Sequence, residues 1–191
     1  MERPILFINA CVRKESRTMR LAEKLLSRLN QPYKEVILHE FPFPVTDEEF
    51  LNIRNQLISD RDFSNPMFEL ARQFVEAETI VIAAPYWDLS FPATLKQYFE
   101  YINVLGITFE YTDDGYPIGL CKADKIYYVT TAGGQFIPEE FGFGYVKALA
   151  ENFYGIPDVR EVEATGLDIE GADADSIMRA AEASIDEMNL E

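Results

Sequence analysis

The sequence predicts an α/β protein whose parallel five-stranded sheet is covered by helices on both faces. Short apolar runs such as residues 80–84 lack the alternation of a half-exposed strand, which indicates strands buried on both faces. Segments with helical periodicity alternate with these runs along the chain, as in a parallel sheet with crossover helices. With 191 residues, of which 48% are hydrophobic, we expect a single domain over residues 1–191.

The first strand and helix are followed by a second strand and a proline-rich segment. Residues 5–8 (ILFI) predict the first strand, and the next segment has an apolar helical face that reaches Leu29. A second strand is expected within residues 33–39. Two prolines in residues 41–44 remove ladder donors and end it. The capping-box pattern of residues 46–49 then predicts a short helix to about Ser59.

The middle of the chain predicts a helix, a buried strand and a second helix. The apolar periodicity of residues 66–76 indicates the first helix, and residues 79–84 form the third strand. We expect the next helix over residues 91–103, with Ser90 at its start and Pro92 in its first turn.

The last part of the chain completes the alternation. Residues 106–122 are irregular, and their Tyr and Gly residues suggest a short hairpin or a lid. A fourth strand (126–131), a helix (138–153), a fifth strand (159–164) and a final helix (173–188) follow.

The charge of the chain excludes several classes of partner. A net charge of −16 argues against nucleic acids and anionic membranes as partners. Residues 158–191 carry eleven acidic residues and two arginines, a net −9. A solvated acidic face explains this segment, and docking of a basic protein is the alternative.

Cysteine and histidine are too few to build a disulfide framework or a metal site. The chain has two cysteines, Cys11 and Cys121, and one histidine, His39, with no close Cys/His cluster. We therefore expect no metal. The longest apolar runs are strand-sized, and the first residues lack the apolar core of a signal peptide, so we expect a cytoplasmic protein with no membrane span.

The loop after the first strand offers groups that bind phosphate. Ser16 and Thr18 carry hydroxyls, Arg17 carries a forked cation, and the start of the following helix has free backbone N–H groups. The loop has no glycines, so it matches neither the Walker loop nor the dinucleotide fingerprint. The alternative is that Ser16 is only a helix cap.

Two further loops suit a flat ligand. The third strand ends in Pro85-Tyr-Trp-Asp-Leu89, and the fourth ends in Thr131-Ala-Gly-Gly134, whose glycines let backbone amides approach a ligand. Taken singly, these are a hydrophobic plug and an ordinary turn. In a parallel sheet, however, they meet the phosphate loop at one edge. A phosphate site beside a planar-ring site predicts bound flavin mononucleotide (FMN).

These motifs resemble those of the flavodoxin-like NAD(P)H dehydrogenase (quinone) and FMN-dependent NADH azoreductase family. The similarity covers residues 4 to about 165, and its central signature matches residues 85–96 and 106–112. The chain departs from the family in having Asp88 where Asn is usual and in lacking the arginine of the loop at residues 131–134. The resemblance implies that FMN contacts Ala10, Ser16, Arg17, Thr18, Pro85, Tyr86, Trp87, Asp88, Leu89, Thr131, Ala132, Gly133 and Gly134.

The resemblance also implies a three-layer flavodoxin-like sandwich with strand order 2-1-3-4-5. It implies a two-fold homodimer with the flavin pockets near the interface, to which aromatic residues such as Tyr98, Tyr101 and Phe109 would contribute.

The function that follows is an FMN-dependent oxidoreductase. Such an enzyme takes hydride from NADH or NADPH and reduces a quinone-like or azo acceptor with ping-pong kinetics. We expect no indispensable catalytic side chain: His39 is interpreted as structural, and a redox role for Cys11, beside Arg13 and Lys14, is the less favoured alternative. A flavodoxin-type electron carrier and a flavin-binding redox regulator are the competing functions.

Overall fold

The computed structural model describes residues 4–190; residues 1–3, on which the expectation about a signal peptide partly rests, and residue 191 lie outside the described residues. A parallel five-stranded sheet with order β2-β1-β3-β6-β7 forms the centre of the fold. This is the predicted order 2-1-3-4-5, and the predicted flavodoxin-like fold is confirmed. The strands are β1 (Ile5–Asn9), β2 (Tyr33–Ile37), β3 (Thr79–Ala83), β6 (Lys125–Thr131) and β7 (Asp158–Ala164).

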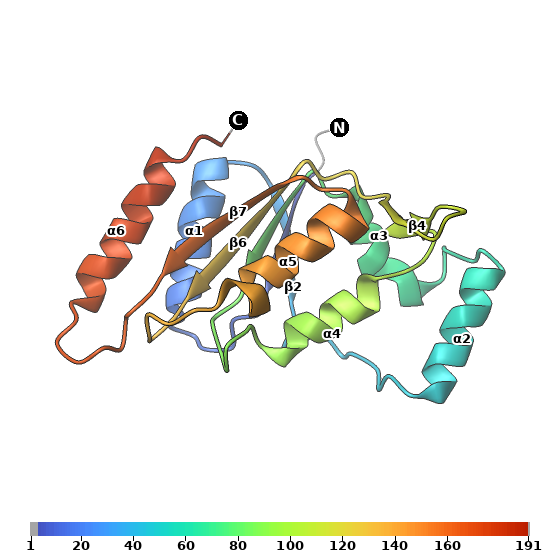
Figure 1. The fold of residues 1–191 in the computed structure, drawn as a ribbon, viewed down its shortest axis with the longest axis horizontal. Helices are drawn as coiled ribbons and strands as arrows, with labels where there is room; N and C mark the ends of the chain where they lie inside the picture. The colour runs from blue at the N-terminus through green and yellow to red at the C-terminus, as the bar shows by residue number, and fades with distance from the viewer. Residues whose placement is uncertain (1–3, 191) are drawn as a thin grey trace.

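Helices cover both faces of the sheet, which gives three layers (Figure 1). The helices α1 (Arg17–Leu29) and α6 (Ala174–Glu187) pack on the face that carries Phe7 and Val81. The helices α3 (Glu69–Glu76), α4 (Ala93–Ile102) and α5 (Phe143–Leu149) pack on the opposite face, which carries Ile8 and Ile82. Both faces of the sheet carry an apolar core, because neighbouring residues of a strand point to opposite faces and Phe7, Ile8, Val81 and Ile82 are all apolar.

The helix α2 (Glu48–Ser59) lies to one side of the sheet (Figure 1) and has no fully buried residue. Its Phe50 ring stacks on Tyr101 of α4, with the ring centres 6.1 Å apart. The capping-box prediction is off by one residue, because the carboxylate of Asp47, not the hydroxyl of Thr46, accepts the Phe50 N–H at 2.9 Å.

Other element ends follow from local chemistry. The Ser16 hydroxyl accepts the Met19 N–H at the start of α1, and Asn30 ends this helix in the left-handed conformation at φ 48°. Two predicted helices are not α-helical throughout. The first turn of the helix that contains α3 is a 3-10 turn (Pro66–Phe68), and α5 is followed by a π turn (Ala150–Tyr154).

The irregular segment after α4 contains the predicted hairpin. Its strands β4 (Phe109–Tyr111) and β5 (Pro117–Gly119) pair in antiparallel fashion. Gly119 packs so closely on the backbone of Tyr154 that a Cβ there would lie 2.0 Å from the Tyr154 carbonyl carbon. Only glycine therefore lets the hairpin contact the π turn.

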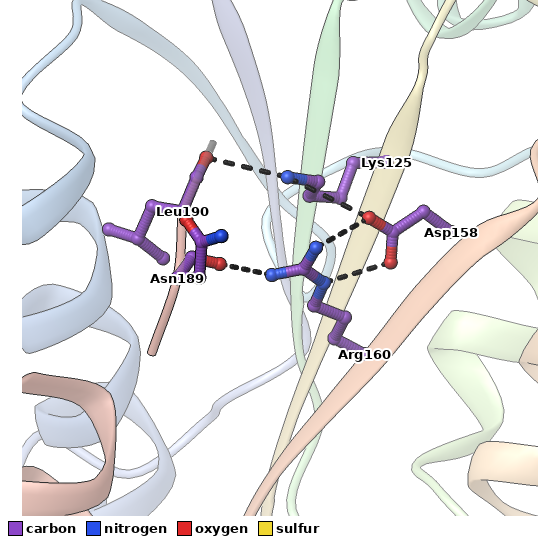
Figure 2. A network of polar contacts seen from close by, with 5 residues as sticks. All are labelled: Lys125, Asp158, Arg160, Asn189 and Leu190. Carbon is purple, nitrogen blue, oxygen red and sulfur yellow. Dashed lines mark hydrogen bonds and ion pairs between the residues drawn. The ribbon is translucent and has the colours of Figure 1, made fainter. Parts of the chain in front are cut away.

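The carboxyl-terminal residues are held at the amino ends of β6 and β7 by a polar network (Figure 2). Asp158 accepts two hydrogen bonds from the Arg160 guanidinium, at 2.9 and 2.8 Å. Arg160 also donates to the carbonyl of Asn189, and the Lys125 ammonium donates to the carbonyl of Leu190. The network lies at the amino ends of these strands, and the loops described next leave the opposite, carboxyl ends. It therefore anchors the end of the chain and takes no part in the pocket formed by those loops.

Candidate functional site

Segments that leave the carboxyl ends of β1, β3, β6 and β7 enclose a pocket of about 370 Å³, here called the rim pocket. The convergence of the three predicted loops is confirmed, and a fourth segment, after β7, joins them. The pocket is lined by Val12, Arg13, Glu15, Ser16, Arg17, Thr18, Pro85, Tyr86, Trp87, Thr131, Ala132, Gly133, Leu167 and Asp168.

The first loop presents the amino end of α1 to the rim pocket. The Ser16 hydroxyl accepts the Met19 N–H at 3.2 Å. The amides of Arg17 and Thr18 have no intrahelical acceptor, and no hydrogen bond within residues 4–190 uses them as donors. Two free N–H groups and the positive end of the helix dipole, beside the Arg17 guanidinium, make this end of the pocket a site for an anion.

A buried hydroxyl pair fixes the first loop against the third. The Oγ1 atoms of Thr18 and Thr131 lie 2.7 Å apart, and both residues are buried. Asn9 fixes the other end of the loop, because its side-chain oxygen accepts the Cys11 N–H at 2.9 Å while its amide group donates to Glu35. Hydrogen bonds within the protein therefore hold the first loop in place before any ligand binds.

The second loop continues the sheet pairing and then folds into a tight turn. The Tyr86 amide donates to the Thr131 carbonyl at 3.1 Å, and the amides and carbonyls of Trp87 and Ser90 bond each other at 2.8 Å. Asp88 and Leu89 occupy the turn with φ of 50° and 70°, the two left-handed residues of a type I′ turn. The prediction that Ser90 starts the next helix is wrong: the turn uses Ser90, and α4 begins at Ala93 after Pro92.

The third loop contacts Asp168, a residue that the sequence pattern did not predict. The Asp168 amide donates to the Gly133 carbonyl at 3.0 Å, and a Cβ on Gly133 would lie 2.4 Å from the Asp168 carboxylate. The Arg17 guanidinium donates a hydrogen bond to this carboxylate at 2.7 Å. Asp168 comes four residues after the fifth strand ends, at the same edge of the sheet as the three predicted loops. This position is the one sequence feature that could have identified it as a site residue.

Nine of the thirteen predicted site residues line the rim pocket, and four do not. Ala10 is buried in the core, and its amide donates to the Ala83 carbonyl. Asp88 and Leu89 face a separate groove on the other side of the turn. Gly134 contributes to the pairing with Gly166 and is not part of the lining. The lining residues not predicted are Val12, Arg13, Glu15, Leu167 and Asp168.

The two residues that the sequence offered for acid–base or thiol chemistry, His39 and Cys11, do not line the rim pocket. Cys11 is 5% exposed, and burial raises the pKa of its thiol, which disfavours the reactive thiolate that a redox role beside Arg13 and Lys14 would need. His39 has an exposed side chain 3.9 Å from Glu40. Within residues 4–190, no group of three or more His, Cys, Asp or Glu residues is arranged to hold a metal ion. No helix in the same range is long and apolar enough to cross a membrane.

The hydroxyl oxygen of Tyr86 is inaccessible to solvent, and burial raises the pKa of this phenol. A phenol is protonated at neutral pH even without this shift, so Tyr86 brings no negative charge to the rim pocket. The arrangement can therefore bind an anionic group at the start of α1 and a planar ring between the second and third loops.

Comparisons with known proteins agree with this arrangement. A family described as having a flavodoxin-like fold matches residues 3–188. The chain is 36% identical to an FMN-dependent NADH:quinone oxidoreductase of Coprothermobacter proteolyticus, with 84% of each chain covered. It is 33% identical to the protein of the same name in Clostridium beijerinckii, with 93% of each covered.

Solved structures show the same fold. The chain is similar to an azoreductase from Bacillus anthracis, with a TM-score of 0.84 and 24% identity over 97% of this chain and 98% of that one. It is also similar to an FMN-dependent NADH-azoreductase from Bacillus anthracis solved in complex with FMN, with a TM-score of 0.82 and 23% identity over 97% of each chain. From its fold, its rim pocket and these relatives, the chain belongs to the flavodoxin-like family that contains the FMN-dependent NADH:quinone oxidoreductases.

Proposed function

We propose that this protein is an FMN-dependent oxidoreductase that uses NADH or NADPH to reduce quinone-like or azo acceptors. The observation that carries the proposal is the rim pocket, where the free amides at the start of α1 and the Arg17 guanidinium lie beside two loops suited to a flat ring. The relatives named FMN-dependent NADH:quinone oxidoreductase supply the class of donor and acceptor.

The residues present fit FMN. The phosphate would bind the amides of Arg17 and Thr18 and the Arg17 guanidinium. The ring would lie between the Tyr86–Trp87 backbone and the third loop, where Gly133 has no side chain to block it. The pocket volume, about 370 Å³, falls within the usual range for small-molecule sites.

When bound, FMN supplies the capacity to accept and donate hydride. The protein's own contribution is to orient the reactants and limit water. The pairing of Tyr86 with Thr131 and the bond between Thr18 and Thr131 hold the loops at fixed separation. Among the described residues that line the rim pocket, none is histidine or cysteine, and its two carboxylates are those of Glu15 and Asp168, of which Asp168 is paired with Arg17. The pocket thus holds no Ser/His/Asp or Cys/His arrangement, and we infer a reaction with no indispensable side-chain acid, base or nucleophile. Donor and acceptor would then enter the same pocket in turn, which gives ping-pong kinetics.

We also propose that the protein forms a cytoplasmic homodimer. The aromatic residues expected at the interface do not support it, because Tyr98 and Phe109 are buried within the chain and Tyr101 packs on Phe50. Support comes instead from exposed apolar side chains on and before α2, a helix with no buried residue: Val45, Leu51 and Ile53. Light scattering should give twice the chain mass of 21.9 kDa at micromolar concentration; a monomer would contradict the homodimer.

The oxidoreductase function is tested by following NADH or NADPH oxidation with a small soluble quinone. Steady turnover with the small quinone is the expected result. Reduction of the bound flavin that passes electrons only to a protein partner would favour the electron carrier, and flavin reduction without turnover with either acceptor would favour the redox regulator.

A further inference from the structure

A second concavity lies on the other side of the Trp87–Ser90 turn from the rim pocket. It has a volume of about 510 Å³ and is here called the apolar groove. Its walls come from the turn, through Leu89, and from residues 140–145, through Phe141. The Ser90 hydroxyl donates to the Phe141 carbonyl, so the two walls are joined by a hydrogen bond.

The floor of the apolar groove is aromatic, and its walls are exposed and apolar. The rings of Phe91 and Tyr145 lie 5.7 Å apart, and both rings pack on Phe99 of α4. Leu89 and Phe141 are 48% and 54% exposed. Covering these two side chains with an apolar molecule would remove apolar surface from water, which is favourable.

The charges around the apolar groove disfavour an anionic occupant. Asp88 and Glu140 contribute two carboxylates, and the Lys96 ammonium is bound by Glu100 one helical turn away. The two carboxylates at the edge of the groove would repel phosphates, and therefore the pyrophosphate of a dinucleotide. The groove therefore suits an uncharged apolar occupant.

The turn connects the apolar groove to the rim pocket. Trp87 lines the rim pocket, and the next two residues, Asp88 and Leu89, line the groove. Two consecutive non-glycine residues with positive φ are unusual and costly, and such conformations persist where the surrounding structure fixes them. This conformation sets Leu89 in the wall of the groove, two residues after Trp87 in the wall of the rim pocket.

We propose that the apolar groove binds the side chain of the electron acceptor, and that the preferred acceptors are quinones with an alkyl or isoprenoid chain. This inference rests on the proposed function, because it assumes that the quinone ring is reduced at the rim pocket. The chain would pass over the turn and lie against Phe91, Phe141 and Tyr145. The groove then determines specificity for the acceptor and leaves the chemistry at the ring unchanged.

The first experiment measures kcat and KM for benzoquinones that share one ring and carry no chain, a butyl chain or a decyl chain. A fully buried methylene would lower KM about fourfold, and an open groove that covers about half of each methylene would lower it about twofold per methylene. We expect this trend in KM, with kcat little changed. A KM that does not depend on chain length would overturn the proposal.

A matched pair of variants locates the effect. Phe141→Ser removes one wall, and we expect it to reduce the gain from the decyl chain at least fivefold while the quinone without a chain keeps its KM. Phe136→Ser is the control, because Phe136 is 78% exposed and does not line the groove. Equal losses in the two variants would mean that general surface hydrophobicity, and not the groove, binds the chain.

A binding measurement does not depend on turnover. Calorimetric titration of the holoenzyme with n-decanol, which cannot accept hydride, should show binding with a negative heat-capacity change. Phe141→Ser should weaken this binding and Phe136→Ser should not. If Phe141→Ser instead halves the mass in light scattering and n-decanol does not bind, a second copy of the chain covers the groove and the proposal is wrong. Absence of turnover with the quinone that has no chain would contradict the proposed function itself.

Discussion

The guanidinium of Arg17 lies 2.7 Å from the carboxylate of Asp168, and this ion pair spans the rim pocket from the start of α1 to the segment after β7. Both side chains are largely exposed, so the pair contributes little to stability. Its importance is for ligand binding, because a phosphate at the free amides of α1 would compete with Asp168 for the same cation.

Arg17→Ala should weaken FMN binding by about 1.5–3 kcal/mol, the usual range for a charge-assisted hydrogen bond. Quenching of flavin fluorescence measures the dissociation constant. Arg20→Ala is the control, because Arg20 lies on the same helix and pairs with Glu182 away from the pocket. Unchanged FMN affinity in Arg17→Ala would remove Arg17 from the phosphate site. Asp168→Asn removes the competing charge, and in this variant binding should tighten by about 0.5–1 kcal/mol.

Gly119→Ala should destabilise the fold by about 2–4 kcal/mol, since the added Cβ would overlap the backbone of Tyr154, which cannot move like a side chain. Urea denaturation gives the free energy of unfolding. Gly134→Ala is the matched control: no heavy atom lies within 4 Å of its added Cβ, and the change should stay within about 0.5 kcal/mol. Equal effects in the two variants would show that the contact between the hairpin and the π turn is not tight.

Leu89→Gly should raise the free energy of unfolding by about 0.5–1 kcal/mol, because glycine adopts positive φ without the Cβ penalty and Leu89 is half exposed. Thermal unfolding monitored by circular dichroism measures the change. The same substitution at Leu105, which is also exposed but has no positive φ, should destabilise. A loss of stability in Leu89→Gly would mean that the leucine side chain contributes more than its strain costs.

Glu161 should make the stability fall as pH rises from about 4.5 to about 7. Burial, with the nearby carboxylates of Glu163 and Glu139, raises the pKa of Glu161 to about 7. Between the unfolded and folded pKa values the native state holds a proton that the unfolded state has released, so increasing pH favours unfolding. After allowance for partial exposure, Glu161→Gln should stabilise by about 1–2 kcal/mol at pH 8 and have little effect at pH 5. Urea denaturation at both pH values measures this, and an equal effect at both would contradict the assigned pKa.

Cys11→Ser and His39→Gln should keep most of the activity, because hydride transfer depends on the placement of the rings and neither side chain lines the rim pocket. A bulky residue in place of Gly133 should instead abolish flavin binding. Turnover and flavin content are measured on the same preparations. A loss of several orders of magnitude in turnover for either conservative variant, with FMN still bound, would show that the side chain is needed for catalysis.

Periodicity in the sequence predicted the elements of the fold because each buried strand and each amphipathic helix leaves a local pattern. The convergence of the three loops followed from the rule that parallel strands end at one edge of a sheet. Asp168 was not predicted because its role depends on a contact with Gly133 and Arg17, which are far away in the sequence.

Contacts between residues distant in the sequence determine the positions of Ser90 and Tyr98, which both differ from the expectation. Ser90 has the chemistry of a helix cap, yet it pairs with Trp87 and bonds Phe141, and α4 begins later. Tyr98 was expected to contribute to a dimer interface, yet it is fully buried on α4 and packs against Phe74 of α3. Both outcomes depend on neighbours distant in sequence, which periodicity does not report.

An anaerobic titration of the purified protein with NADH or NADPH, followed by a quinone, tests whether this protein is an FMN-dependent oxidoreductase. We expect that the protein carries FMN, that the nicotinamide bleaches the flavin absorption in a single two-electron step, and that a stoichiometric quinone restores it. A protein that binds no FMN when FMN is supplied, or a bound FMN that neither nicotinamide nor quinone changes, would show that it is not such an enzyme.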